Sequence, residues 1–431
     1  MKTVTTNLCP FAVRSGGHMT WPGSNVQGGV TIDLRLLNNI DIDEKRSVAG
    51  LGPGSKWKTV YSAMELYNLT AVGGRLPDVG VGGFLLGGGI SLLSFRNGFG
   101  SDNVVNYEIV LADGTIVNAN ANSHPDLFWA LKLGSTNYGV VTRFDVRMYP
   151  LRDVWGGIRT YAVTSKDTPR LLSSWISFAQ GEAATREELQ GLFIGRWRKS
   201  GVDEIATVWH ASLDSVPGPS LTDAPIIDDF TRTTSLLDLV NDLQSGDLAD
   251  TKRNRWHTLT VKLDASFFWD VFNHAKSIFD KLEYISGMHW DLTFQPITRG
   301  FLTASSETGG NPFKSVLEES EDDLALIAYL ISWKDAADDE VMNQAIRDLG
   351  IWSEGVARER GILNRFLYLN YANEEQPVYT RSVSQKDMAR MMDVKRRYDA
   401  KNTLGRLWIG GFKLPKDEPG TVFESSSRIE L

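Results

Sequence analysis

The stretch from residue 11 to residue 28 places the strongest constraint on how this chain can fold. Its first three residues, Phe-Ala-Val, predict a short strand, and the loop that follows consists of Arg14, Ser15, Gly16, Gly17 and His18. Adjacent glycines allow a turn with φ > 0, in which successive N–H groups point inward and can bind an anion such as a pyrophosphate. Arg14 can add charge, and His18 is the only nucleophilic side chain of the loop. A structural turn with a hydrogen-bonded histidine fits the same residues.

Two further segments share this character. Residues 72–91 contain eight glycines but neither the Gly-Lys-Ser/Thr end of a P-loop nor the glycine spacing of a Rossmann turn. Backbone with so few side chains lets a flat cofactor lie directly against it, although a glycine-rich hairpin or buried turn is the alternative. Residues 125–142 read Pro-Asp-Leu-Phe-Trp-Ala-Leu, then Lys-Leu, then Gly-Ser-Thr-Asn-Tyr-Gly-Val-Val-Thr.

These three segments, in this order, resemble the flavin-binding segments of the vanillyl-alcohol oxidase superfamily, and most closely a fungal relative of berberine bridge enzyme. The resemblance implies a PCMH-type FAD-binding domain with FAD joined covalently to His18. Members with two links carry a cysteine where this chain has Leu76, so no second link is expected. A valine at the place of Val79 goes with oxygen reactivity in that family. The implied cofactor-binding residues are Arg14, Ser15, Gly16, Gly17, His18, Val79, Gly80, Gly83, Gly87, Gly88, Gly89, Ser91, Gly139, Val140, Val141 and Asn370.

Near the C-terminus, residues 365–373 and 392–399 resemble the C-terminal signature of berberine bridge enzymes. We expect residues 368–371, Tyr-Leu-Asn-Tyr, to form a strand that returns to the flavin, with Tyr368 and Asn370 on one side and Tyr371 on the other. The resemblance implies that Tyr371 or Tyr368 is the catalytic base. Core packing with a hydrogen-bonded hydroxyl is the alternative for either tyrosine.

The middle of the chain alternates in short blocks, which predicts an antiparallel sheet flanked by helices and makes the fold class α+β. The expected boundaries are residues 1–152 for an N-terminally abbreviated FAD-binding domain, 153–362 for a substrate domain, 363–415 for a segment returning to the FAD domain, and 416–431 for a disordered tail. In the substrate domain, residues 305–323 are expected to form a polar loop. His257, His289 and Gln295 are candidates to line the pocket.

Composition excludes several classes of function. A net charge of −8 without a basic patch argues against nucleic-acid partners, and no apolar run is long enough to span a membrane. Cys9 is the only cysteine, and the histidines have no metal-like spacing, so neither a disulfide nor a metal site is expected. The N-terminus lacks the apolar core of a signal peptide, whereas relatives in the family are often secreted, so the localisation stays open.

The expected function is that of an FAD-dependent oxidoreductase that transfers hydride from an alcohol, a sugar or a secondary-metabolite intermediate to flavin N5. The expected partners are the small-molecule substrate and molecular oxygen, which would make the protein an oxidase that releases hydrogen peroxide. A dehydrogenase of the same fold is one alternative. The other is a non-catalytic remnant, because the family's segment before the first loop is missing here, which would expose sheet edges.

Overall fold

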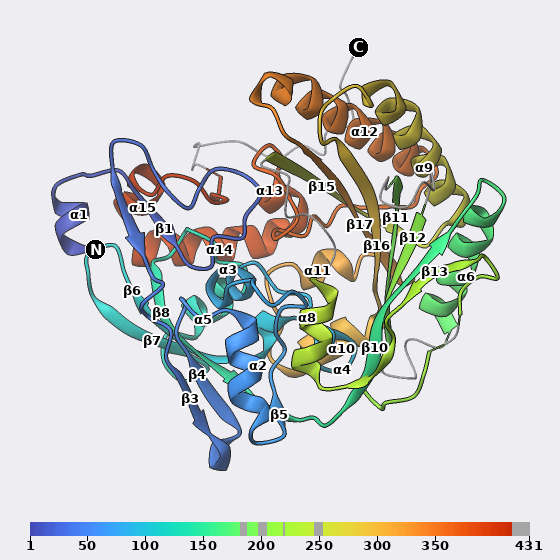
Figure 1. Cartoon of the computed structure of the whole chain (residues 1–431). Helices are drawn as coiled ribbons and strands as arrows, with labels where there is room; N and C mark the ends of the chain where they lie inside the picture. Colours follow the sequence, from blue (N-terminus) through green and yellow to red (C-terminus); the bar gives the residue numbers. More distant parts are fainter. Residues whose placement is uncertain (182–187, 197–204, 219, 245–252, 416–431) are drawn as a thin grey trace.

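The computed structural model describes residues 1–181, 188–196, 205–218, 220–244 and 253–415, and the expected disordered tail at 416–431 lies outside them. The first half of the molecule comprises residues 1–150, and the second half begins with the strand at Val154. In the first half, a five-stranded antiparallel sheet has the order β3-β4-β8-β6-β7 (Figure 1). Two pairs accompany it, parallel β1-β2 and antiparallel β5-β9. The strands are β1 (Phe11–Arg14), β2 (Val30–Asp33), β3 (Ile40–Asp43), β4 (Val48–Leu51), β5 (Leu69–Thr70), β6 (Val104–Val110), β7 (Ile116–Asn120), β8 (Val140–Arg147) and β9 (Tyr149–Pro150).

Short helices surround this first sheet. They are α1 (Lys2–Thr6), η1 (Glu44–Arg46), α2 (Trp57–Glu65), α3 (Val81–Leu86), α4 (Ser94–Asn97), η2 (Gly100–Asn103) and α5 (Pro125–Leu131). Helix α2 buries Trp57, Val60, Tyr61 and Met64, which recur at helical spacing and therefore form one apolar face. The second glycine segment folds partly as helix α3, which the sequence analysis did not anticipate.

The second half is built on one large antiparallel sheet with the order β13-β10-β12-β11-β16-β17-β15-β18, and β14 pairs with β10 beside this path. Its strands are β10 (Val154–Ala162), β11 (Glu188–Arg196), β12 (Ile205–Ser212), β13 (Ile226–Asp229), β14 (Arg232–Thr234), β15 (Arg253–Lys262), β16 (His289–Ile297), β17 (Leu324–Trp333) and β18 (Leu363–Asn364). The predicted α+β class and the predicted antiparallel substrate sheet are both confirmed.

Helices α6 (Asp167–Gly181), α9 (Ala265–Phe279) and α12 (Asp339–Glu359) cover one face of this sheet, and its other face is turned toward the first half (Figure 1). Trp175 and Phe268 on two of these helices pack against each other and against Phe294 of β16, with ring centroids 6.1, 6.1 and 4.7 Å apart. The helices of this half are α6 (Asp167–Gly181), α8 (Leu236–Leu243), α9 (Ala265–Phe279), η3 (Asp280–Leu282), α10 (Arg299–Glu307), α11 (Lys314–Leu317), η4 (Ala336–Asp338) and α12 (Asp339–Glu359). Residues 305–323 were expected to be a loop, but they hold the end of α10 and all of α11, because Val316 and Leu317 are buried.

The C-terminal segment contacts both halves. Strand β18 pairs with β15 of the large sheet, whereas Trp408 forms a bridge with Phe11 of β1. Between these points lie helices α13 (Val378–Ser382), α14 (Gln385–Tyr398) and α15 (Thr403–Leu407). This segment therefore lies across the boundary between the first half and the second half.

The strand expected at residues 368–371 is wrong, because these residues form a turn. The N–H of Tyr371 donates to the carbonyl of Tyr368 at 2.9 Å, and the N–H of Ala372 donates to the same oxygen at 3.0 Å. Asn370 favours such a turn, and its amide donates across this boundary to the carbonyl of Phe84 at 3.1 Å. The prediction that Tyr368 and Tyr371 lie on opposite sides is also wrong, because the centroids of their rings are 4.9 Å apart.

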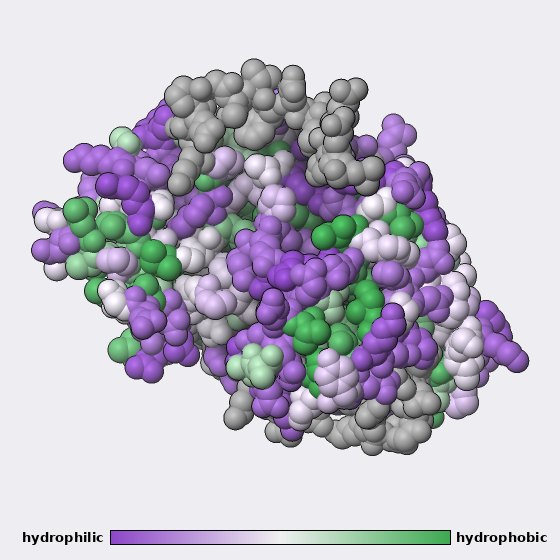
Figure 2. Space-filling model, turned by 90° about the horizontal axis from the view of Figure 1, so that it is seen from above, coloured by the Kyte–Doolittle hydropathy of each residue, from purple (hydrophilic) through white to green (hydrophobic). Residues whose placement is uncertain are grey.

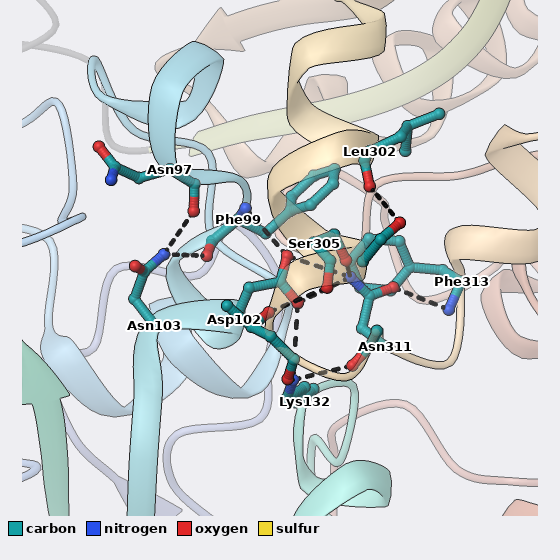
Figure 3. A network of polar contacts seen from close by, with 12 residues as sticks. Asn97, Phe99, Asp102, Asn103, Lys132, Leu302, Ser305, Asn311 and Phe313 are labelled. Atoms are coloured by element: carbon teal, nitrogen blue, oxygen red, sulfur yellow. Dashed lines mark hydrogen bonds and ion pairs between the residues drawn. The ribbon is translucent and has the colours of Figure 1, made fainter.

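A buried ion pair in the first half carries hydrogen bonds that join the two halves (Figure 3). Asp102 and Lys132 are each 1% exposed, and their charged atoms lie 3.8 Å apart. From the other half, Asn311 donates to Asp102 at 3.0 Å, and Lys132 donates to the carbonyls of Thr308 and Gly310 at 3.1 and 2.8 Å. Burial raises the pKa of Asp102 and lowers that of Lys132, so the attraction and the hydrogen bonds both act against desolvation.

The outer surface carries mixed chemistry. Figure 2 shows a largely hydrophilic face on which hydrophobic residues gather only in small groups. Across the described ranges, none of the helices combines the length and the apolar character needed to span a membrane. Nor do the described residues contain a group of three His, Cys, Asp or Glu side chains suited to a metal ion.

We predict that Lys132→Met lowers the free energy of unfolding by about 3–5 kcal/mol, because it leaves the Asp102 carboxylate buried without its counter-ion. Urea unfolding followed by circular dichroism measures the change. The matched control is Arg170→Met, which removes the exposed partner of Asp223 and should change stability by less than about 1 kcal/mol. Equal changes in the free energy of unfolding for the two substitutions would contradict the stabilising role of the buried ion pair.

Candidate active site

A cavity of about 1200 Å³ lies between the two halves. Ligand pockets in proteins usually measure about 300–1,000 Å³, so this one has room for a cofactor and a second molecule. Its walls include the two glycine loops of the first half, the free face of the large sheet, and the turn at residues 368–371. Residues between 135 and 144, the end of α8, and residues 408–412 also contribute to the lining. Each wall comes from a different part of the chain, so the cavity exists only when the halves are joined.

The two glycine loops touch each other backbone to backbone. A Cβ added to Gly16 would lie 2.5 Å from the Cα of Gly80, and a Cβ added to Gly80 would lie equally close to Gly16. Ser15 fixes the first loop by donating its hydroxyl to the carbonyl of Pro53 at 2.5 Å. Gly83 differs from its neighbours, because it faces the cavity and a Cβ added there would meet no atom within 4 Å. Bare backbone facing a large cavity is a surface that suits FAD.

Most of the residues that the sequence analysis assigned to the cofactor line this cavity. They are Ser15, Gly16, Gly17, His18, Val79, Gly80, Gly83, Gly139, Val140, Val141 and Asn370. Both candidate catalytic residues, Tyr368 and Tyr371, line it too. The structure thus brings together residues as far apart in sequence as Ser15 and Tyr371, and their role as flavin contacts stays a prediction.

Five assigned residues do not line the cavity: Arg14, Gly87, Gly88, Gly89 and Ser91. The three glycines pack against protein instead, since an added Cβ would lie 2.1 Å from Asn370 Oδ1, 3.3 Å from the Phe313 ring and 2.6 Å from the Phe84 ring, respectively. Ser91 is buried and accepts a hydrogen bond from the N–H of Leu93 at 3.3 Å, and Arg14 is exposed. These residues shape the fold around the site rather than its surface.

The imidazole of His18 projects into the cavity from the first loop. Its side chain is open to the cavity, yet the surrounding protein removes part of its hydration, and this burial lowers the pKa of His18. Nearby Asp78 opposes that shift only weakly. A lowered pKa keeps the imidazole neutral at neutral pH, which is the form that can act as a nucleophile.

Two donors converge on the phenol oxygen of Tyr371. Arg75 donates to it at 2.5 Å from the second glycine segment, and Gln295 donates to it at 2.8 Å from β16. The ring of Tyr371 also meets that of Trp256 edge-on at 5.1 Å. Because both donors occupy lone pairs of the oxygen, its own proton is free to point into the cavity. When that proton is absent, the negative charge on the oxygen faces a guanidinium.

Tyr368 occupies a different environment. Its hydroxyl accepts a hydrogen bond from the N–H of Ile90 at 2.8 Å and another from the Asn370 amide at 3.2 Å. Burial and the neighbouring Tyr371 raise the pKa of Tyr368 well above its usual value. The hydroxyl of Tyr368 therefore holds main chain of the first half, and proton loss from it is unfavourable.

The large sheet presents alternate residues of β16 to the cavity. His289, Asp291 and Thr293 line it, and Gln295 follows on the same face. His257 was a candidate for this wall, but it lies on the helix-covered face, where a Cβ added to Gly350 of α12 would be 2.4 Å from its Nε2. Arg75 was not anticipated, and its only signal in the sequence is a lone cation within a glycine-rich segment.

Residues 1–120 match the family described as an FAD binding domain. The chain is 34% identical over 431 residues to the FAD-dependent monooxygenase FUP4 of Fusarium proliferatum, covering 96% of this chain and 82% of that protein. It is 34% identical to the FAD-dependent monooxygenase tpcD of Cochliobolus heterostrophus, covering 94% and 80%. The fold is similar to that of 6-hydroxy-D-nicotine oxidase from Arthrobacter nicotinovorans, with a TM-score of 0.75 at 24% identity and coverage of 94% and 87%.

Berberine bridge enzyme from Eschscholzia californica is also similar in fold, with a TM-score of 0.72 at 17% identity over 96% of this chain and 88% of that chain. The protein is thus an FAD-dependent oxidoreductase with an FAD-binding domain, and it belongs to the family of these fungal flavoproteins. Its fold is the one shared by 6-hydroxy-D-nicotine oxidase and berberine bridge enzyme. These similarities do not support the alternative of a non-catalytic remnant.

We predict that Gly83→Ala lowers the FAD content of the purified protein but leaves the melting temperature of the flavin-free protein unchanged or slightly higher, because the new methyl enters the cavity and not the protein. Gly80→Ala should lower the melting temperature even without flavin, because its Cβ collides with the first loop. Flavin absorbance per chain and thermal unfolding separate the two effects. Gly355→Ala, in open space inside α12, is the control that should leave the flavin content unchanged and raise the melting temperature slightly. Full flavin retention in Gly83→Ala would contradict the placement.

Proposed function

We propose that FAD lies against the two glycine loops and that the enzyme oxidises a carbon bearing a hydroxyl or amino group on a small molecule held against the large sheet. Bound FAD supplies a hydride acceptor at N5. The substrate class is an alcohol, a sugar or a secondary-metabolite intermediate. The wall of the cavity favours the last of these, because Trp209, Trp256 and Leu330 offer a flat apolar surface.

The arrangement around Tyr371 is the observation that carries this proposal. Its phenol oxygen faces the cavity, and Arg75 and Gln295 both donate to it. Tyr371 therefore takes the proton of the substrate hydroxyl or amine as a phenolate base, and Arg75 compensates the negative charge that this oxygen carries until the proton arrives. Tyr368 serves as a positioning residue, since its hydroxyl holds the N–H of Ile90.

Tyr371→Phe should lower the rate of flavin reduction by about 10²–10⁴-fold with little change in flavin content, because it removes the base and keeps the ring. Anaerobic stopped-flow absorbance measures this rate, with a substrate found by screening benzylic alcohols, oligosaccharides and phenolic metabolites. Tyr368→Phe is the matched control: it should lower stability by about 1–3 kcal/mol, because the N–H of Ile90 is left unsatisfied, but change the reduction rate only a few-fold. The opposite ranking of the two variants would reject Tyr371 as the base.

Val79 lines the cavity and supports the proposal that oxygen reoxidises the flavin and leaves as hydrogen peroxide. The name monooxygenase, which the relatives FUP4 and tpcD carry, favours a second candidate, in which one oxygen atom enters the product. Turnover under ¹⁸O₂ distinguishes them. An oxidase yields one peroxide per product and no label in the product, whereas a monooxygenase labels the product. Slow reoxidation by oxygen would instead indicate a dehydrogenase.

The covalent link to His18 is also part of the proposal, and it rests on a neutral imidazole that opens to the cavity. After acid precipitation, flavin fluorescence should remain in the protein pellet of the wild type and move to the supernatant for His18→Ala. Leu76→Ala is the control, because it changes the other lining residue at which a link could be sought and should leave the pellet fluorescent. Free flavin in the wild-type supernatant would support the binding of FAD and contradict a covalent bond to His18.

A further inference from the structure

The face of β16 that lines the cavity carries a polar group far from Tyr371. Asp291 Oδ2 lies 3.2 Å from Nε2 of His289, and the hydroxyl of Thr293 donates to Asp291 Oδ1 at 3.3 Å. The side chains of His289 and Asp291 are 17% and 18% exposed, and both line the cavity. A carboxylate held from both sides keeps a fixed direction, and each oxygen retains a lone pair for a further donor.

The register of the sheet places this group relative to the base. Gln295, which contacts Tyr371, and Asp291 lie four residues apart on one strand and on one face, so their Cα atoms are roughly 13 Å apart. Leu330 and Ala328 of β17 pair with Asp291 and Thr293 and also line the cavity. The path from base to carboxylate is thus apolar and flat, with one polar group near each end.

The charge on the described lining residues is mostly negative. It comprises the carboxylates of Asp228, Asp242 and Asp291 and a single guanidinium, that of Arg75. Asp242 has Arg232 as an ion-pair partner at 2.5 Å, and Arg75 is engaged with Tyr371 at the other end. An anionic group placed beside Asp291 would meet repulsion, because the only Lys or Arg among the described lining residues is Arg75, which is engaged with Tyr371, whereas a hydroxyl or an ammonium would find an acceptor.

From these observations we infer that Asp291, oriented by His289 and Thr293, is the specificity-determining residue at the end of the substrate cavity remote from Tyr371. It selects extended, flat substrates whose far end carries a hydrogen-bond donor, a hydroxyl or an ammonium, and it rejects substrates with a carboxylate at that end. This inference rests on the proposed function for the identity of the reacting end. The recognition step itself requires only binding.

The test uses the FAD-loaded enzyme and four probes that share a biphenyl-4-methanol body, with hydroxyl, aminomethyl, hydrogen or carboxylate at the 4′ position. Anaerobic isothermal titration calorimetry gives each Kd, and aerobic turnover gives kcat and KM. For the wild type, we expect the hydroxyl and aminomethyl probes to bind about tenfold more tightly than the unsubstituted one, and the carboxylate probe to bind more weakly than it. If only one of the two donor probes gains, that result decides between hydroxyl and ammonium as the selected group.

In Asp291→Asn, the penalty on the carboxylate probe should disappear, and the advantage of the aminomethyl probe should fall about tenfold. Asp228→Asn is the matched control, because it removes an equal charge from an exposed part of the cavity wall and should leave the ranking of the probes unchanged. If Asp291→Asn fails to keep the wild-type melting temperature, Asp291→Ser takes its place with the same expected loss of ranking.

An unchanged ranking in the folded Asp291 variant would overturn the inference. So would a wild type that binds the carboxylate probe most tightly. If the Kd pattern follows the expectation but no probe reduces the flavin, the proposed oxidation fails while the recognition stands. If the probes are oxidised and the ranking ignores Asp291, the oxidation stands and the recognition fails.

Discussion

The hydrogen bonds made by the buried pair of Asp102 and Lys132 hold the two halves of the molecule together at the boundary that also holds the cavity. Both residues of the pair belong to the first half, and Asn311 of the second half donates to Asp102. Phe313 lies two residues further along the chain, and its ring packs against Phe99 at 4.7 Å and Phe366 at 5.4 Å. The segment that holds Asn311 and Phe313 therefore contacts both the ion pair and the chain that enters the turn at residues 368–371. Removing either charge would leave the other buried without a partner, which is strongly destabilising.

The turn itself is held from both sides. Tyr368 and Asn370 bind main-chain groups of the first half, at Ile90 and Phe84, whereas Tyr371 receives Gln295 from the large sheet. A strand at this place would direct Tyr368 and Tyr371 to opposite faces. The observed turn brings both rings to the boundary between the halves, where one hydroxyl can hold structure and the other can face the substrate. The different environments of Tyr368 and Tyr371 are therefore a consequence of the turn in the backbone, which their spacing in the sequence did not reveal.

Local pattern predicted much of this molecule. Short alternating or apolar blocks located the strands of the large sheet, and the nearly continuous apolar run at residues 324–333 is one of them. The three glycine segments marked walls of the cavity. Glycine, however, indicates only that something approaches the backbone closely. At Gly87 the close neighbour is Asn370, so the same signal that marked Gly83 misassigned Gly87. Arg75 escaped prediction because its partner Tyr371 lies 296 residues away, and no local rule connects them.

The separation of the two polar ends of the cavity has an electrostatic reason. A guanidinium about 4 Å from a phenolate stabilises it by about 4 kcal/mol at an effective dielectric constant of about 20. A carboxylate at roughly 13 Å, the spacing of the Cα atoms of Gln295 and Asp291, would oppose such a charge by only about 1 kcal/mol under that assumption. Arg75 therefore outweighs Asp291 at the phenol of Tyr371, although both act in one cavity. A carboxylate at the position of Gln295 would instead oppose the phenolate at contact distance. With an amide at 295 and a carboxylate at 291, one strand can support both the base and the recognition of a hydrogen-bond donor on the substrate.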